Sequence, residues 1–116
     1  VIWCAAGNAG KTKQIFYPAA YPEVIAIGAI DENLERARFS CTGVDLDFMA
    51  PGVKILSTVP DNWYAVLSGT SMANPFAVGL ACLLLSCKRK YNINVELKTS
   101  NDYINFFKKF TISTNS

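Results

Sequence analysis

Residues 69–75 read Gly-Thr-Ser-Met-Ala-Asn-Pro and stand where a polar loop meets an apolar segment. A serine in the first turn of a helix can direct its hydroxyl toward a cleft while its own backbone N–H points to the same place. The positive end of the helix dipole then favours negative charge that develops there. Ser71 is therefore a candidate nucleophile whose attack creates an oxyanion. The same three residue types are also common as a helix cap, so the motif alone leaves both interpretations open.

A second segment of interest, residues 5–12, reads Ala-Ala-Gly-Asn-Ala-Gly-Lys-Thr and follows an apolar run. Its end resembles a phosphate-binding loop, with Ala5 where the first glycine is expected. Phosphate binding at such a loop requires a helix that begins at the Lys-Thr pair. Pro18 and Pro22 leave room for about one helical turn. Nucleotide binding is therefore the remotest of the functional hypotheses.

Composition limits the chemistry that the chain can perform. The 116 residues are 51% hydrophobic and 17% charged, which suits one compact domain or part of a larger one. There is no histidine, so a mechanism that needs an imidazole base cannot be completed from this chain. The net charge of +2 gives no reason to expect nucleic acid as a partner. The longest apolar stretch, residues 76–85, is too short to span a bilayer, so we expect no membrane span.

The start of the chain and its cysteines bear on origin and compartment. The chain begins at Val1 within an apolar run, and we interpret it as a piece of a longer polypeptide. The four cysteines form no C-x-x-C pair, and we predict no disulfide framework. Cys4 and Cys82 lie in apolar segments and are predicted to be small buried side chains. The cysteines therefore do not indicate the cellular compartment of the protein.

Apolar runs at residues 1–6 and 24–30 predict strands that are buried on both faces. Residues 47–50 predict a brief strand that ends at a Pro-Gly pair. Residues 53–59 and 63–67, separated by Pro-Asp-Asn, predict a hairpin. Strands of this buried type with a buried helix indicate an α/β fold.

The strongest helix is predicted at residues 71–88, with Ser68 or Thr70 as its cap. This segment is apolar almost all round, which is typical of a central buried helix. A second helix is predicted at residues 101–109. Nothing indicates a second domain.

Several motifs, taken in chain order, resemble the subtilisin-like serine peptidases (subtilases, peptidase S8). Residues 69–79 resemble the serine segment of that family, and residues 5–10 resemble its oxyanion-hole segment. Residues 17–29 and 47–53 resemble the family's intervening loops and strands. The resemblance covers about residues 1–88. It implies part of a three-layer α/β fold with a mostly parallel sheet and a buried helix that carries the serine.

The same resemblance implies that residues 1–116 are the C-terminal portion of a single catalytic domain, with residues 89–116 as a basic tail and helix. It implies that Ser71 is the nucleophile. The carboxamide of Asn8 and the backbone N–H of Ser71 would form the oxyanion hole, supported by Thr70 and Gly69. One wall of the substrate pocket would consist of Ala5, Ala6 and Gly7.

Two further features are implied around the next loop. The Tyr17–Pro18 peptide bond resembles a cis bond of the family. The backbone carbonyls of Ala19, Tyr21 and Val24 resemble a weak site for calcium or sodium, ions that prefer oxygen ligands. A turn that holds no ion is an equally open interpretation, and no cofactor is required for the chemistry.

The chain also departs from the family pattern. Phe76 stands where many members have a histidine, and we expect it to pack against the core. The catalytic Asp and His segments of the family, which precede the serine segment, are absent, and Asp31, Asp45 and Asp47 follow Asn8 and so do not match. Without those segments, we expect exposed sheet edges and an exposed apolar helix face.

The leading hypothesis is a serine endopeptidase that acts through a Ser acyl-enzyme. An N-terminal segment, in the same precursor or an associated chain, would supply Asp and His, and this chain alone would be inactive. Expected partners are a peptide or protein substrate and a propeptide. The alternative is a pseudoprotease with a peptide-binding or regulatory role. Secretion or a cell-surface location is favoured by the resemblance only.

Overall fold

The computed structural model describes residues 1–10 and 14–114, and its centre is a three-stranded parallel sheet. The strands are β1 (Ile2–Ala5), β2 (Val24–Ile30) and β3 (Phe48–Pro51), in the order β1-β2-β3. Trp3 lies opposite Ile25 in the β1–β2 pair. The predicted α/β class with a mostly parallel sheet is confirmed, and the strand predicted at residues 24–30 has those bounds.

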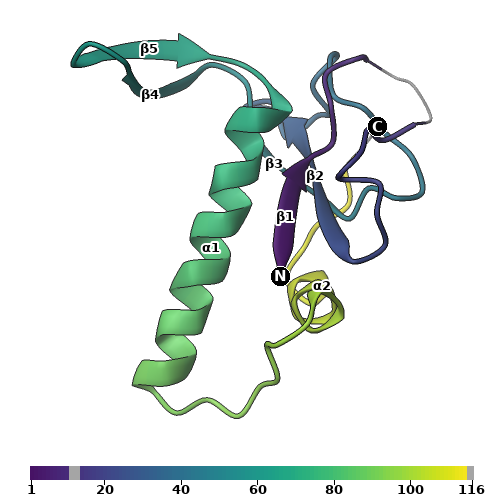
Figure 1. Cartoon of the computed structure of the whole chain (residues 1–116), viewed down its shortest axis with the longest axis vertical. Coiled ribbons are helices and arrows are strands. Elements are labelled where there is room, and N and C mark those ends of the chain that lie inside the picture. Colours follow the sequence, from purple (N-terminus) through teal and green to yellow (C-terminus); the bar gives the residue numbers. More distant parts are fainter. Residues whose placement is uncertain (11–13, 115–116) are drawn as a thin grey trace.

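The predicted hairpin is also present. It consists of β4 (Ile55–Val59) and β5 (Trp63–Leu67), which pair antiparallel. Asp61 and Asn62 take the positive φ angles of its turn. Figure 1 shows that the hairpin extends away from the three-stranded sheet, beyond the N-terminal end of the long helix.

Irregular segments, and not helices, connect the parallel strands in the described part of the chain. Residues 14–23 form turns between β1 and β2, and residues 31–47 connect β2 to β3. The first connection contains the cis Tyr17–Pro18 bond that the resemblance implied. Ile15 and Cys41, one from each connection, are almost completely buried. The connections therefore cross the sheet and bury apolar side chains, as a crossover helix would.

The side chains of β2 alternate between two cores, because successive residues of a strand point to opposite faces. Ile25, Ile27 and Ala29 belong to a cluster that includes side chains of both helices. Ala26 belongs to a second cluster, made with side chains of the connecting loops. Within this chain the three layers are thus helices, sheet and loops.

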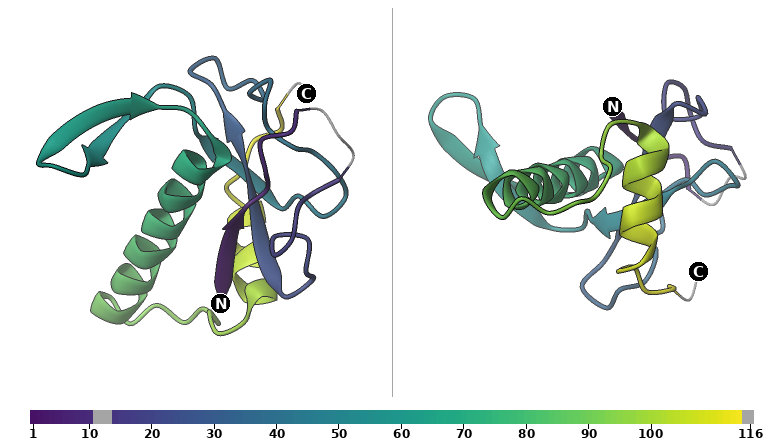
Figure 2. Two further views of the ribbon diagram at one scale, coloured as in Figure 1. Left: turned by 45° about the horizontal axis from the view of Figure 1, so that its top comes forward. Right: turned by 90° about the horizontal axis from the view of Figure 1, so that it is seen from below.

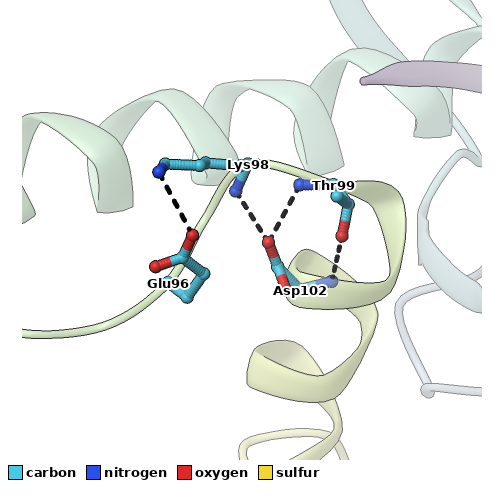
Figure 3. A network of polar contacts seen from close by, with 4 residues as sticks. All are labelled: Glu96, Lys98, Thr99 and Asp102. Carbon is cyan, nitrogen blue, oxygen red and sulfur yellow. Dashed lines mark hydrogen bonds and ion pairs between the residues drawn. The ribbon is translucent and has the colours of Figure 1, made fainter.

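The two helices are α1 (Thr70–Lys90) and α2 (Ser100–Lys108), close to their predicted positions. The capping box of α2 is formed by Thr99 and Asp102: Thr99 Oγ1 accepts from the Asp102 N–H, and the Asp102 carboxylate accepts from the Thr99 N–H (Figure 3). On the sheet side of α2, the rings of Tyr103 and Phe107 lie 5.8 and 5.7 Å from the ring of Trp3 in β1.

The burial predicted for α1, as a central helix that is apolar almost all round, is found on one side of the helix only. Only Thr70, Ala73 and Ala81 are buried, whereas Leu83 is 65% exposed. Phe76 is half exposed and does not pack into the core as predicted. The reason is that α1 lies against one face of a small sheet, so only one side of the helix has neighbours (Figure 2).

The same arrangement corrects the cysteine predictions. Cys82 is exposed on α1, and Cys4 is only partly buried. By length and composition α1 could also cross a membrane, which the shorter stretch of residues 76–85 did not indicate. One such helix is weak evidence for a span, because core helices of soluble proteins meet the same criteria.

Candidate active site

Helix α1 begins directly after Gly69, and no side chain caps it. Ser68 Oγ accepts instead from the backbone N–H of Lys54, at 2.9 Å. Thr70 Oγ1 accepts from the backbone N–H of Gly7, at 3.2 Å. The prediction that Ser68 or Thr70 caps the helix is therefore wrong, because contacts from distant segments occupy both hydroxyls.

Asn8 and Thr70 are joined by two hydrogen bonds. Asn8 Oδ1 accepts from the Thr70 N–H at 2.9 Å and from the Thr70 hydroxyl at 2.8 Å. Thr70 is 1% exposed, so these bonds lie at the edge of the core. Because both donors engage the oxygen of the carboxamide, its nitrogen must point the other way. Thr70 thus determines the orientation of the Asn8 side chain.

The Asn8 amide nitrogen and the Ser71 backbone nitrogen approach the same point above Gly69. An added Cβ on Gly69 would lie 3.6 Å from Asn8 Nδ2 and 3.7 Å from Ser71 N. Among the described residues, nothing accepts a hydrogen bond from either nitrogen. Asn8 and Ser71 are both exposed. The structure therefore brings together two available N–H donors beside the hydroxyl-bearing residue.

Gly52 connects this site to the end of the sheet. The Gly52 N–H donates to the Ile30 carbonyl at 3.0 Å, and the Gly69 N–H donates to the Gly52 carbonyl at 2.8 Å. A Cβ on Gly52 would lie 2.7 Å from Ala29 Cβ and 2.8 Å from the Gly69 carbonyl oxygen. Only glycine allows this approach, so Gly52 determines where α1 begins relative to β2.

The three residues predicted to form a pocket wall have different surroundings. Ala5 and Gly7 are partly buried, whereas the Ala6 side chain is completely buried. It lies in the cluster of Ala6, Ile15, Ala19, Ala26 and Cys41, here called the loop-side core. Ala6 can contribute to a wall only through its backbone. Gly7 has a φ of 114°, and a Cβ there would lie 2.3 Å from a ring carbon of Phe16, so this position requires glycine.

The loop with the predicted cation ligands is compact. The Tyr21 carbonyl already accepts from the Val24 N–H at 3.0 Å, and the Tyr17 and Tyr21 rings lie 4.7 Å apart. In the described part of the chain, no three His, Cys, Asp or Glu side chains gather as metal ligands. A cation here would thus depend on neutral carbonyl oxygens, including that of Ala19.

The phosphate-loop hypothesis lacks its helix. Lys11 and Thr12 lie outside the described residues, and residues 14–23, which follow, form turns and irregular backbone. No helix N-terminus is therefore available within residues 14–23 to hold a phosphate.

Among the residues that the structure describes, Asp47 and Asp102 have carboxyl groups with shifted pKa values. Burial raises the pKa of Asp47, although the Ala26 N–H bonded to its carboxylate at 2.8 Å and the nearby Lys108 oppose this effect. The backbone N–H groups of Thr99 and Lys98 lower the pKa of Asp102 (Figure 3). Both groups belong to the scaffold, on the approach to β3 and at the start of α2.

A search of protein-family models matches residues 1–112 to the subtilase family, peptidase S8. The chain belongs to the subtilase family. The resemblance inferred from the motifs is thereby confirmed, and it extends beyond residue 88 into the segment of α2.

Curated relatives of this subtilase include subtilisin DY from Bacillus licheniformis, which is 52% identical over 89 residues. That match covers 74% of this chain and 32% of subtilisin DY. The thermophilic serine proteinase of Bacillus sp. (strain AK1) is 48% identical over 98 residues, which cover 84% of this chain and 23% of that protein. The chain thus spans a third or less of the length of these relatives.

Among solved structures, the prenylagaramide maturation protease PagA matches with a TM-score of 0.75 and 37% identity. The match covers 79% of this subtilase chain and 34% of PagA. The self-cleaved protease domain of PatA matches with a TM-score of 0.72 and 40% identity, over 76% of this chain and 34% of that domain.

Two residues that shape the site in this subtilase chain have no functional motif in the sequence, namely Gly52 and Cys41. In the sequence, Gly52 is the second residue of the Pro-Gly pair after a strand, and Cys41 is one of four cysteines. A glycine directly after a strand was the available signal for Gly52. For Cys41 no local signal exists, because the two hydrogen bonds that join it to Gly7 and Ala9 span more than 30 positions of the chain.

Proposed function

We propose that this chain supplies the nucleophile and the oxyanion hole of a serine endopeptidase. Ser71 Oγ attacks the scissile carbonyl carbon, and its proton passes to a base. Asn8 Nδ2 and the Ser71 N–H donate to the carbonyl oxygen as it becomes negative. The base returns this proton to the nitrogen of the cleaved peptide, which leaves as an amine, and water then hydrolyses the acyl-enzyme ester and restores the Ser71 hydroxyl.

The orientation of the Asn8 carboxamide is the observation that most supports this proposal. Thr70 engages Asn8 Oδ1 with two donors, so Nδ2 is turned toward Gly69 and Ser71 before any substrate binds. An oxyanion hole stabilises a transition state best when its donors need no reorganisation. Thr70 therefore acts on the reaction through Asn8.

The general base must come from outside these 116 residues, because they contain no histidine. We assign the Asp and His to an N-terminal segment of the same precursor or to an associated chain. The relatives are three or more times longer than the matched segment, which leaves room for such a segment. The isolated chain is then inactive, since nothing removes the proton from Ser71.

The proposal extends to partners and location. The substrate is a peptide or protein, the backbone of Ala5 to Gly7 lines the pocket for the residue before the cleaved bond, and a propeptide accompanies maturation. The protein acts outside the cell or at its surface, as a subtilisin-type peptidase. In the assembled enzyme, helix α1 is a core helix and not a membrane span, because its first turn carries Ser71 and one side packs on the sheet.

A fluorophosphonate probe tests the assignment of Ser71. The assembled enzyme, in which this chain is combined with the segment that carries Asp and His, should be labelled at Ser71. The Ser71→Ala variant is the control and should remain unlabelled. Absence of labelling under conditions that modify subtilisin DY would refute the peptidase and favour the pseudoprotease, which retains the fold without a functional base.

The weak cation site is a separate part of the proposal. The carbonyls of Ala19, Tyr21 and Val24 would bind calcium or sodium, with no part in the chemical steps. Titration of either ion should raise the melting temperature of the assembled enzyme more than choline chloride does at equal ionic strength. An equal rise in melting temperature with the calcium, sodium and choline salts would refute the proposed cation site.

A further inference from the structure

The fully buried residue Cys41 contacts the backbone on both sides of Asn8. Its backbone N–H donates to the Gly7 carbonyl at 3.0 Å, and its sulfur accepts from the Ala9 N–H at 3.4 Å. Gly7 and Ala9 are the two chain neighbours of Asn8. The contacts are long-range, since Ala9 and Cys41 are 32 positions apart.

The segment that carries Cys41 is itself bound to the central strand. Ser40 Oγ accepts from the Ala29 N–H of β2 at 3.0 Å, and Arg36 Nη1 donates to the Ser40 carbonyl at 2.7 Å. The Phe39 carbonyl accepts from the Gly10 N–H at 2.8 Å, which adds a third bond to residues 7–10, here called the Asn8 loop. The Asn8 loop is therefore hydrogen-bonded to residues 39–41, which are themselves hydrogen-bonded to β2.

We propose that Cys41 is a positioning residue for Asn8, which deepens the proposed function and rests on it. Thr70 determines the direction of the Asn8 side chain, and Cys41 holds the backbone from which that side chain extends. Asn8 is exposed, so packing alone does not hold it. A misplacement of about 1 Å at a reacting centre can cost about 10²-fold in rate, which makes this backbone support relevant to catalysis.

The sulfur atom suits this position. It is a weak but large acceptor, and it reaches the Ala9 N–H while also packing on Gly7, where an added Cβ would lie 3.1 Å from it. Removal of the sulfur would leave the Ala9 N–H without this acceptor and open space beneath Gly7. Both changes loosen the loop on either side of Asn8.

A double-mutant cycle in the assembled enzyme tests the proposal, with kcat expressed per titrated active serine. We expect Cys41→Ala to lower kcat about 3–10-fold and to change KM less than about twofold, because Asn8 acts in the transition state. Cys41→Ser, whose hydroxyl can accept from the Ala9 N–H, should restore most of kcat. Cys4→Ala is a matched control, since Cys4 borders the same loop-side core and is not bonded to the Asn8 loop.

The decisive comparison is made in the Asn8→Ala background. If Cys41 acts through Asn8, Cys41→Ala should have no further effect on kcat there. An equal loss in both backgrounds would overturn the positioning role while leaving the proposed function intact. No loss of kcat in Asn8→Ala alone would refute the oxyanion role itself. If Cys41→Ala does not fold, Cys41→Val replaces it in the same cycle.

Discussion

Thr70 binds Asn8 through both its backbone N–H and its side-chain hydroxyl, at 2.9 and 2.8 Å from the same oxygen. The hydroxyl in turn accepts from the Gly7 N–H, so one side chain joins the start of α1 to two residues of the β1–β2 connection. In subtilisin, a member of this family, loss of the oxyanion-hole asparagine lowers kcat by about 10²–10³-fold.

Thr70→Val should lower both stability and turnover of the assembled enzyme. The substitution keeps the shape of the side chain but removes the hydroxyl that bridges Gly7 and Asn8. We expect a loss of about 1–3 kcal/mol in the free energy of unfolding, measured by urea denaturation, and a lower kcat. Thr70→Ser keeps the hydroxyl and is the control; if its kcat falls as far as that of Thr70→Val, the bridge is not the cause.

Gly69→Ala should lower kcat and leave stability nearly unchanged, whereas Gly52→Ala should mainly lower stability. A Cβ on Gly69 has only ordinary contacts, the closest at 3.4 Å, but it occupies the space between Asn8 Nδ2 and Ser71 N. We therefore expect kcat to fall at least about tenfold with little change in stability. A Cβ on Gly52 would overlap Ala29, and we expect a loss of about 1–3 kcal/mol.

Melting curves and active-site titration of the two variants separate these effects. A Gly69→Ala enzyme with normal kcat would show that the space above Gly69 is not where the oxyanion forms.

Acidification should weaken the start of α2. The bonds from the backbone N–H groups of Lys98 and Thr99 lower the pKa of Asp102 below 3.8, its ordinary value. The native state thus favours the carboxylate, and the stabilisation is present above pH 3.8 and lost as pH falls through the lowered pKa. Hydrogen-exchange protection of α2 amides, corrected for intrinsic rates, should fall over that range.

Asp102→Asn should remove much of this pH dependence, whereas Glu96→Gln should not. Glu96 forms only an exposed ion pair with Lys98, at 3.4 Å (Figure 3). An unchanged pH profile in Asp102→Asn would assign the effect to another group.

Asp47 should show the opposite dependence on pH. Its native pKa is raised by burial, so the native state binds the proton more strongly than the unfolded chain does. The stabilisation from the protonated carboxyl is present below pH 3.8 and lost as pH rises through the raised pKa. Asp47→Asn, which keeps an acceptor for the Ala26 N–H, should raise the urea midpoint at pH 7 and not at pH 3. A lower midpoint at pH 7 would contradict this.

The isolated chain should associate in solution. Leu80 and Leu83 on α1 are 57% and 65% exposed, and Trp63 on the hairpin is 71% exposed. Such apolar surface favours self-association or aggregation. Size-exclusion chromatography with light scattering should show species larger than 12.7 kDa. Replacing both leucines with lysine should reduce the association, and a monodisperse wild-type monomer would be the contrary result.

The elements of this fold were largely predictable from local patterns. The strand at residues 24–30 has the predicted bounds. A strand buried on both faces is a continuous apolar run, and such a run can be identified in the sequence without knowledge of the neighbouring strands. Helix α1 and the hairpin were found within a few residues of their predicted bounds. The exposure of Cys82 and Phe76 was not predictable, because an apolar residue has the same sequence signal whether or not a neighbour covers it.

Local sequence patterns were enough to predict the type and order of the elements, the motif around Ser71 and the family. They were enough because backbone propensity and hydrophobic periodicity act between residues that are near in the chain. Which side-chain atoms come into contact depends on the packing of distant segments and is seen in the folded structure alone. Thr70 matches the pattern of a helix cap, yet its hydroxyl bonds residues 62 and 63 positions away. A threonine hydroxyl can bond to the nearby helix backbone or to a distant group, and the packing of the layers determines which of these lies within hydrogen-bond distance.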